Sequence, residues 1–264
     1  MTRSAHIKTL VKLIQDNGYR HHIHDVFRDF MELAACSVSN TIDPLNAAVR
    51  EERYMQVIGK YDAAEQQRFP KMFATLVDAL EDGPDDVLGA VFGELEQGNA
   101  RTGQFFTPYS LCRLMAEMTV GDGDEIRAEI DRKGFITASE PAVGAGAQII
   151  ALAEAMQKAG LNYQEHLHVT AVDVDARAVH MAYLQLSLLS IPAIVVLGNT
   201  LTLEEREHWR TPAHFLGLWD NKLRRGYALG SAMDGADKEE PAVLSAMPLP
   251  ADIQLDLFGI KEAA

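Results

Sequence analysis

The sequence predicts an α/β protein in which an all-helical unit precedes a parallel sheet. Apolar residues recur at helical spacing from position 7 to about position 98. Short strand-like segments then alternate with helical ones between residues 135 and 197. This order of strand, helix, strand, helix, strand is the one that produces parallel strands joined by right-handed crossovers.

The N-terminal domain, residues 1–98, is predicted to be α-helical throughout. Its apolar residues fall three and four apart, as in Ile7, Leu10, Val11 and Ile14 and again in Phe69, Met72, Phe73, Leu76, Val77 and Leu80. Gly83 and Pro84 end this second helix. Asp85 is expected to cap the next helix, because a side-chain oxygen before a helix can accept from its free amides.

The second domain, residues 99–219, is predicted to contain three strands at 135–139, 168–172 and 193–197. Helices are expected at 147–158 and 176–189. Residues 203–219 could add a helix and one short strand at 215–219. The sheet is thus apparently truncated, and its first strand stands at an edge. An uncovered edge promotes aggregation, so the N-terminal helices, a second copy or another protein should cover it.

Composition limits the classes of function. The net charge of the 264 residues is −14, and the only compact basic cluster is KLRR at residues 222–225. Since Lys and Arg supply most non-specific affinity for DNA, tight DNA binding by this chain alone is not expected. No apolar run approaches the roughly 20 residues of a membrane span, and no signal peptide is legible. Cys36 and Cys112 are expected to be buried thiols, and the protein cytoplasmic.

A candidate ligand site lies where the first two strands end. Residues 140–146 read EPAVGAG and open a helix, and Asp173 ends the second strand. Ligands of parallel α/β sheets bind beyond the carboxyl ends of the strands, where glycines allow close approach and a carboxylate can accept from ribose hydroxyls. By themselves these features are equally compatible with a tight strand-to-helix turn and a helix N-cap.

Two further motifs make the interpretation specific. Residues 103–108 read GQFFTP and residues 86–89 read DVLG, both upstream of the glycine turn. In this order the motifs resemble those of the gamma-type DNA adenine-N6 methyltransferases, including the modification subunits of type I restriction systems. The resemblance covers about residues 86–201. It implies a Rossmann-like core that is dependent on S-adenosylmethionine.

The resemblance also implies the cofactor-binding residues. Those near the methionine end are Phe106, Thr107 and Pro108, and those of the loop are Glu140, Pro141, Gly144 and Gly146. Asp173 would hold the ribose and Val174 would pack on adenine. Asn199 stands where the family usually has an acidic residue near the adenine ring.

The motif that performs the methyl transfer in this family is not recognisable. The family uses [DNS]PP[YF], whose polar groups accept from the adenine amine and whose aromatic ring stacks on the flipped base. The nearest segment is TPAHF at residues 211–215, with one proline. Catalytic residues are therefore unknown. The chain is either a DNA adenine-N6 methyltransferase completed by a partner, or a catalytically inactive interaction protein such as a restriction-modification decoy or an accessory factor.

The third segment, residues 220–264, is predicted to be a flexible tail because Ala, Gly, Pro and acidic residues dominate it. Near its end stand Gln254, Leu255, Asp256, Leu257 and Phe258. This QLDLF segment resembles the peptide by which proteins bind the bacterial sliding clamp. The alternative is an amphipathic patch that docks on the chain's own core. Further expected partners are DNA, reached directly or indirectly, a second copy, or a complementing methylase or specificity subunit; a bacterial mobile element is the expected source.

His21, His22 and His24 are not expected to bind a metal. Only His21 and His24 would share a helix face, at a spacing of three, and no cysteine or carboxylate pair completes a ligand set. A solvated helix surface is the favoured interpretation.

Overall fold

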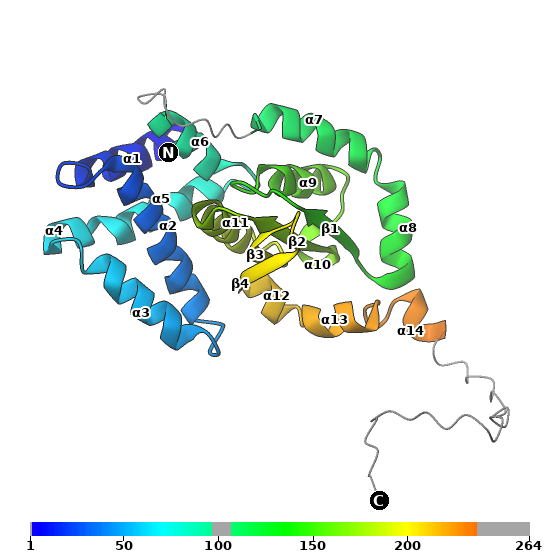
Figure 1. The fold of residues 1–264 in the computed structure, drawn as a ribbon. Coiled ribbons are helices and arrows are strands. Elements are labelled where there is room, and N and C mark those ends of the chain that lie inside the picture. The colour runs from blue at the N-terminus through cyan, green and yellow to red at the C-terminus, as the bar shows by residue number, and fades with distance from the viewer. Residues whose placement is uncertain (1, 97–106, 237–264) are drawn as a thin grey trace, which may run out of the picture.

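The computed structural model describes residues 2–96 and 107–236, which form an α/β protein with four strands among many helices (Figure 1). The strands are β1 Ile136–Glu140, β2 Leu167–Asp173, β3 Ala193–Asn199 and β4 Glu204–Arg210. The helices before the sheet are α1 Arg3–Asn17, α2 Ile23–Asn40, α3 Ala47–Ile58, α4 Ala63–Gln66, α5 Arg68–Leu80, α6 Val87–Glu96, α7 Tyr109–Val120 and α8 Asp124–Lys133. The others are α9 Ala147–Lys158, α10 Tyr163–His166, α11 Ala176–Leu188, α12 Pro212–Leu216, α13 Trp219–Arg225 and α14 Ala232–Ala236.

The sheet has the order β1-β2-β3-β4, with β1 to β3 parallel and β4 antiparallel to β3. The three predicted strands and the two helices between them are confirmed within one or two residues. The edge position of β1 is confirmed as well. Because all three carboxyl ends of β1, β2 and β3 lie at one end of the sheet, the loops that follow them meet there.

The strand predicted at residues 215–219 is wrong. The fourth strand is β4, with the sequence EEREHWR, and residues 212–216 form α12. The sequence did not predict β4 because this strand has few apolar residues. Of its residues, Trp209 is buried and those from Glu204 to Arg206 are exposed. As an edge strand beside solvent, β4 has no apolar run to signal it.

One face of the sheet is covered by helices. Side chains of adjacent residues point to opposite faces of a strand, and paired residues of parallel strands share a face. On this covered face Leu167, Val169, Ala171, Ala193 and Val195 are fully buried beneath α9, α11 and the N-terminal helices. The covered face therefore carries the main core of the α/β part.

The opposite face, called here the open face, is covered at Val196 of β3, which is buried, and where β1 and β2 begin. There the buried His168 ring lies 5.1 Å from the Trp219 ring, and its Nε2 is 2.9 Å from Nδ1 of His214. Burial lowers the pKa of His168 to about 4 and also lowers the pKa of His214, so the hydrogen bond joins two neutral imidazole rings at pH 7. Farther along the same face Thr137, Ser139 and Thr170 are all exposed.

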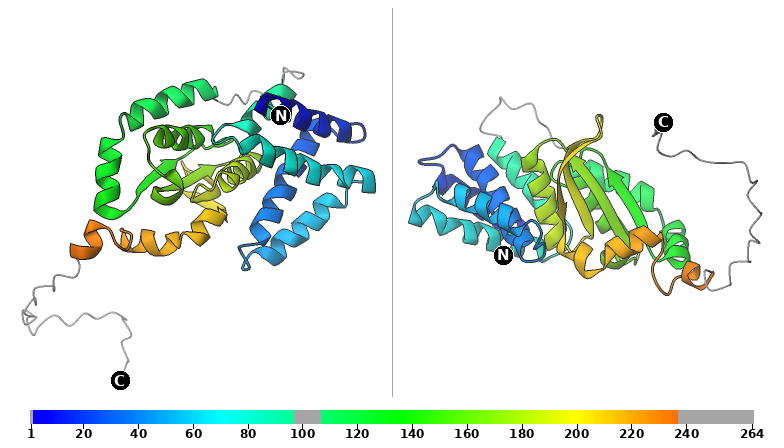
Figure 2. Two further views of the ribbon diagram at one scale, coloured as in Figure 1. Left: turned by 180° about the vertical axis from the view of Figure 1, so that it is seen from behind. Right: turned by 60° about the horizontal axis from the view of Figure 1, so that its bottom comes forward.

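The helices α1 to α6 confirm the helical prediction for the N-terminal part, and they pack on the side of the sheet that holds α11 (Figure 2). Trp209 of β4 is the largest residue at this contact and is fully buried. The Arg50 guanidinium lies 4.1 Å from the centre of its ring and donates to His208 O over 2.9 Å. One core cluster extends from Leu10 to Trp209. The domain boundaries at residues 98 and 219 stay predictions.

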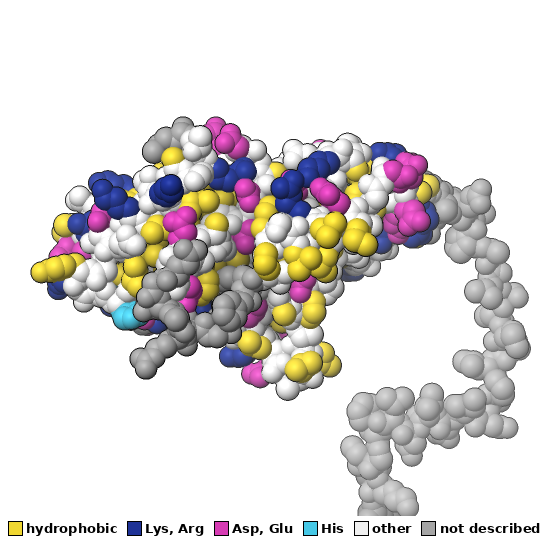
Figure 3. Space-filling view, turned by 90° about the horizontal axis from the view of Figure 1, so that it is seen from above, with side chains coloured by type: hydrophobic (Ala, Val, Ile, Leu, Met, Phe, Trp, Pro, Cys, Tyr) yellow, Lys and Arg dark blue, Asp and Glu magenta, His cyan; other side chains and the backbone are white. Residues whose placement is uncertain are grey.

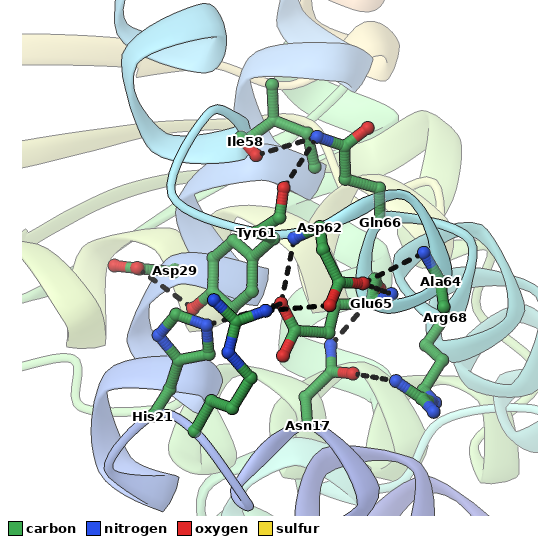
Figure 4. Close-up of polar contacts among 11 residues, drawn as sticks. Asn17, His21, Asp29, Ile58, Tyr61, Asp62, Ala64, Glu65, Gln66 and Arg68 are labelled. Atoms are coloured by element: carbon green, nitrogen blue, oxygen red, sulfur yellow. Dashed lines mark hydrogen bonds and ion pairs between the residues drawn. The ribbon is translucent and has the colours of Figure 1, made fainter.

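The start of α2 corrects the prediction for the histidines. The helix begins at Ile23, so His21 precedes it and shares no helix face with His24. His21 lies beside Tyr61 and Glu65, with 4.4 Å between the His21 and Tyr61 ring centres (Figure 4). Tyr61 in turn donates to the buried Asp29 over 3.0 Å. The local sequence could not show these contacts because they come from residues about forty positions away.

The cap of α6 is Asp86, one residue later than predicted. Its Oδ1 accepts from Gly89 N over 2.9 Å, whereas Asp85 pairs with Arg3 at 2.9 Å. Asp86 is buried, and burial raises its pKa above the ordinary value. Gln185 of α11 donates to the same Oδ1 over 2.9 Å. This buried pair joins the N-terminal helices to the α/β part.

The cysteines are buried, as predicted, and burial raises the pKa of Cys36 to about 11. Among residues 2–96 and 107–236, no helix combines the length and apolar character that crossing a membrane requires. The described part of the predicted tail, up to residue 236, holds most of α13 and all of α14.

Candidate functional site

The loop after β1 forms the centre of the candidate site. Gly144 and Gly146 have positive φ angles of 54° and 98°, which a residue with a Cβ rarely adopts. They turn the chain from β1 into α9. Gly146 stands at the N-cap of α9 and no side chain caps the helix, so the amides of its first turn are available to a ligand.

The carboxylate of Asp173, at the end of β2, holds this loop in place. Its Oδ2 accepts from Gly144 N and its Oδ1 accepts from Asp175 N, both over 2.9 Å. Glu140, at the end of β1, accepts from Ala142 N over 3.1 Å. Each carboxylate oxygen has two lone pairs, so both side chains keep acceptor capacity for hydroxyl or ammonium donors of a ligand.

The residues beyond β2 and β3 complete the rim. Val174 is 58% exposed although it is apolar, so it offers a surface for a flat ring. Asn199 Oδ1 accepts from Leu201 N over 3.0 Å, which leaves the side-chain amide as a donor. Thr200 donates to Pro141 O over 2.8 Å and thereby fastens the end of β3 to the β1 loop. The structure thus brings these predicted residues together at one end of the sheet.

The predicted residues upstream of α7 are only partly described. Phe106 lies outside the described residues, while Thr107 and Pro108 are exposed just before the helix. Thr107 O accepts from the thiol of Cys112 over 3.9 Å, and Tyr109 donates to Glu154 of α9 over 3.0 Å. These contacts hold the start of α7 against α9, the helix that the glycine loop opens.

The chemistry of the site selects among adenosine ligands. Two carboxylates, Glu140 and Asp173, end adjacent strands, and segments 140–146 and 173–174 contain no basic residue. A pyrophosphate beside them would be repelled. Ribose hydroxyls, an ammonium group and a sulfonium centre would all be favoured, because carboxylates accept hydrogen bonds and carry the opposite charge. The residues therefore fit S-adenosylmethionine better than a phosphate-bearing nucleotide.

Residues 211–215, the nearest match to the missing catalytic motif, lie at the other end of the sheet. Thr211 N donates to O of Ala193, the first residue of β3, over 3.0 Å, and Thr211 Oγ1 donates to Ile191 O over 2.9 Å. Both Thr211 and His214 are buried. The segment thus anchors α12 and cannot face a ligand held by the carboxyl ends of the strands.

Sequence reasoning missed two residues that shape the site. Thr200 was not singled out, although its position just after Asn199 at a strand end was a signal. Gln185 is fully buried and its side-chain amide donates to Ala145 O over 2.8 Å as well as to Asp86. Its Oε1 accepts from Leu88 N over 2.9 Å. An uncharged polar residue within the apolar run of α11 was the only signal.

The surface around the site is apolar and acidic. Helix α7, which begins two residues after Thr107, buries Cys112, Ala116 and Val120. It also exposes an apolar stripe at intervals of three and four, made of Leu111, Leu114, Met115 and Met118. Seen from above, hydrophobic side chains are exposed over both halves of the molecule, where Lys, Arg, Asp and Glu side chains lie among them (Figure 3). This surface is typical of a protein contact, whereas DNA contacts are usually basic.

No group of three or more His, Cys, Asp or Glu side chains in residues 2–96 and 107–236 is placed to hold a metal ion. The segment predicted to bind the sliding clamp, Gln254, Leu255, Asp256, Leu257 and Phe258, lies outside the described residues.

The fold and the site define a class: an α/β protein with a four-stranded mixed sheet and an acidic glycine loop at the carboxyl ends of its parallel strands. The family model for N-6 DNA Methylase matches residues 85–216, half of the chain. The chain therefore belongs to this family, and the resemblance stated from its motifs is confirmed.

Solved structures show more distant similarity. A proposed class I S-adenosylmethionine-dependent methyltransferase from Listeria monocytogenes is 12% identical with a TM-score of 0.40, and the match covers 72% of this chain and 52% of that one. The methyltransferase subunit of a type I restriction-modification system from Streptococcus thermophilus is 20% identical with a TM-score of 0.37, covering 72% and 38%. The chain thus matches only about half of the first protein and less of the second. A comparison with curated proteins gives no match.

Proposed function

We propose that the chain binds S-adenosylmethionine and serves as the cofactor-binding part of a DNA adenine-N6 methyltransferase that a partner completes. The observation that carries this proposal is the loop of residues 140–146, held by Asp173, in a chain of the N-6 DNA Methylase family. Asp173 and Glu140 would accept from the ribose and amino groups, Val174 would pack on adenine, and Asn199 would donate to its ring. When bound, the cofactor supplies an electrophilic methyl group.

This chain's contribution is to hold and orient the cofactor. A glycine loop fixed to β2 by Gly144 and to β3 through Thr200 is rigid before the ligand arrives, which limits the entropy lost on binding. The described residues at this rim include no aromatic side chain beside a polar–proline pair that could receive a flipped base. Base binding is therefore assigned to a partner such as a complementing methylase or specificity subunit.

A methyl-transfer assay tests the proposal. Labelled S-adenosylmethionine and adenine-containing DNA are incubated with the full chain alone and with the protein that co-purifies with it. We expect 6-methyladenine, identified by mass spectrometry of the digested DNA, only in the second reaction. Cofactor binding without transfer in any complex would support the catalytically inactive alternative. Transfer by the isolated chain would exclude that alternative and the need for a partner.

We further propose that the segment QLDLF at residues 254–258 binds the bacterial sliding clamp. A peptide of this kind places apolar side chains in a pocket, and it can tie an acidic protein to DNA without a basic surface. Leu257→Ala combined with Phe258→Ala should lower recovery of the clamp in a pull-down at least 10-fold. Ala251→Ser with Ala263→Ser is the matched control. Equal recovery by all three chains would exclude the contact.

A further inference from the structure

We infer that Asn199 presents only a hydrogen-bond donor to the base of a bound nucleoside, so that the site takes a 6-oxopurine as readily as adenine. This inference rests on the proposed function, because it concerns the base of the ligand proposed there. It goes beyond that function because it names the group of the base that the site leaves unread and the range of bases that the site accepts. The argument starts from the end of β3.

Asn199 lies where the base of such a ligand would reach. The strands β2 and β3 are adjacent and parallel, and Asp173 pairs with Leu197, so Asn199 stands one strand away and two residues farther along. Val174, which follows Asp173, is exposed. With the ribose at Asp173 and the base on Val174, the base extends away from the sugar toward the end of β3. Its far edge, which carries N1 and the group at position 6, would meet Asn199.

The backbone determines how the Asn199 amide is oriented. Its Oδ1 accepts from Leu201 N over 3.0 Å and from Thr202 N over 3.4 Å. If the amide were turned over, its NH₂ group, which can only donate, would face these two N–H groups and neither bond could form. Oδ1 is therefore committed to the turn after β3, and Nδ2 is the end that remains for a ligand.

The end of β3 is held from two sides. Thr200 donates to Pro141 O over 2.8 Å, which joins this end to the glycine loop. Asn199 pairs with Glu204 across the turn, and a Cβ at Gly198 would collide with the backbone O of Glu204. The two strands thus approach so closely that only glycine fits at this position. The donor is in place before a ligand binds, and little entropy is lost in ordering it.

A donor at this place reads a purine differently from a carboxylate. In adenine N1 accepts and the 6-amino group donates, whereas in hypoxanthine the 6-oxo group accepts and N1 donates. Nδ2 can therefore donate once to either base, to N1 of adenine or to O6 of hypoxanthine. An aspartate at position 199 would instead present its second oxygen, which accepts from the 6-amino group and repels O6. Asn199 thus gives the site little selection between the two bases.

Glu204 carries a carboxylate that could accept from the 6-amino group instead, since it pairs with Asn199 across the turn. Its side chain is 60% exposed, and its Oε1 lies 3.6 Å from Nε of Arg206. A carboxylate that is exposed to water and already faces a cation gains little from one more donor. Selection of the base is therefore assigned to Asn199, and Glu204 provides the control.

Calorimetric titration of two ligands into the full chain tests the inference. The ligands are S-adenosylhomocysteine and its deaminated analogue S-inosylhomocysteine, which differ only at position 6 and N1 of the base. We expect their Kd values to agree within about fivefold, because Asn199 donates once to either base. A Kd for the inosine analogue that is more than about fivefold higher would overturn the inference.

The variant Asn199→Asp converts the free end of the side chain from a donor into an acceptor and keeps Oδ1 for the turn. We expect it to bind S-adenosylhomocysteine at least about 10-fold more tightly than S-inosylhomocysteine, because O6 now faces a carboxylate. The control Glu204→Gln removes the neighbouring carboxylate and should leave the ratio of the two Kd values as it is in the unaltered chain. A ratio that Asn199→Asp leaves unchanged, or that Glu204→Gln changes equally, would also contradict the inference.

The same titrations separate this inference from the proposed function. If the folded, unaltered chain binds neither ligand, the proposed function fails and the inference fails with it. If the chain binds S-adenosylhomocysteine but rejects the inosine analogue, the proposed function stands and the inference alone is refuted.

Discussion

Replacing Asp173 with alanine is expected to abolish detectable binding of S-adenosylmethionine. The carboxylate has two roles: it would accept from the ribose, and it holds Gly144 N and Asp175 N over 2.9 Å. Loss of a charge-assisted pair of hydrogen bonds costs about 3 kcal/mol, or roughly a 100-fold rise in Kd. Release of the glycine loop adds to this loss, since the loop would have to be ordered again on binding.

Calorimetric titration of the cofactor into both proteins checks this result. Asp131→Ala is the matched control, because it removes an equally charged but exposed residue of α8. Circular dichroism shows whether the variants are folded. A Kd for Asp173→Ala within threefold of that of the unaltered chain would exclude the assigned role. Binding by neither protein would mean that the loop is inherited architecture without a ligand.

The substitution with the largest expected effect on stability is Gln185→Leu. It would leave the buried Ala145 O and Leu88 N without a partner, and it would leave the buried Asp86 Oδ1 with Gly89 N as its remaining donor. Two unmade hydrogen bonds and the loss of one of two donors to a buried carboxyl group together cost about 3–5 kcal/mol of unfolding free energy. Urea unfolding measures the loss. Gln157→Leu, an exposed glutamine of α9, should change the free energy by less than about 0.5 kcal/mol.

The pH dependence of this stability loss should show that the Asp86 carboxylate causes it. Burial raises the pKa of Asp86 in the folded chain, so its unfavourable contribution is absent below the unfolded pKa and grows as pH rises through the folded pKa. Without Gln185 that pKa rises further, and the loss of stability should be larger at pH 8 than at pH 5. Asp86→Asn added to Gln185→Leu should recover part of it. A loss below 1 kcal/mol, independent of pH, would contradict this account.

The sequence was sufficient for the parts of the fold that buried apolar residues define. The apolar runs around Val169 and Val195 lie in β2 and β3, as predicted. The alternation of strands with helices predicted that these strands are parallel. β4 was missed because an edge strand beside solvent needs no apolar run. The sequence also placed the cap of α6 one residue early, since two adjacent aspartates can both cap and only tertiary contacts assign Asp86.

The site residues at strand ends and in the glycine loop could be predicted, because neighbouring residues in the sequence are enough to recognise these features. Glu140, Gly144 and Asp173 were named from sequence and lie together in the structure. Contacts between distant segments were not predictable. Gln185 reaches a residue 99 positions away, and nothing in its neighbourhood shows that Asp86 will be there. The edge position of β1, which holds for the described residues, was predicted because the first of the three legible strands had a neighbour on one side only.

The order β1-β2-β3-β4 also has a consequence for folding during synthesis. Each strand pairs with the one made immediately before it, so the sheet can assemble in the order in which the ribosome releases it. Short sequence separation between pairing strands keeps the loop-closure cost low and folding fast. β1 is released first, so Asp173 can fix the glycine loop that follows β1 as soon as β2 has paired. The core of the candidate site can therefore form before β3 and β4 have been synthesised.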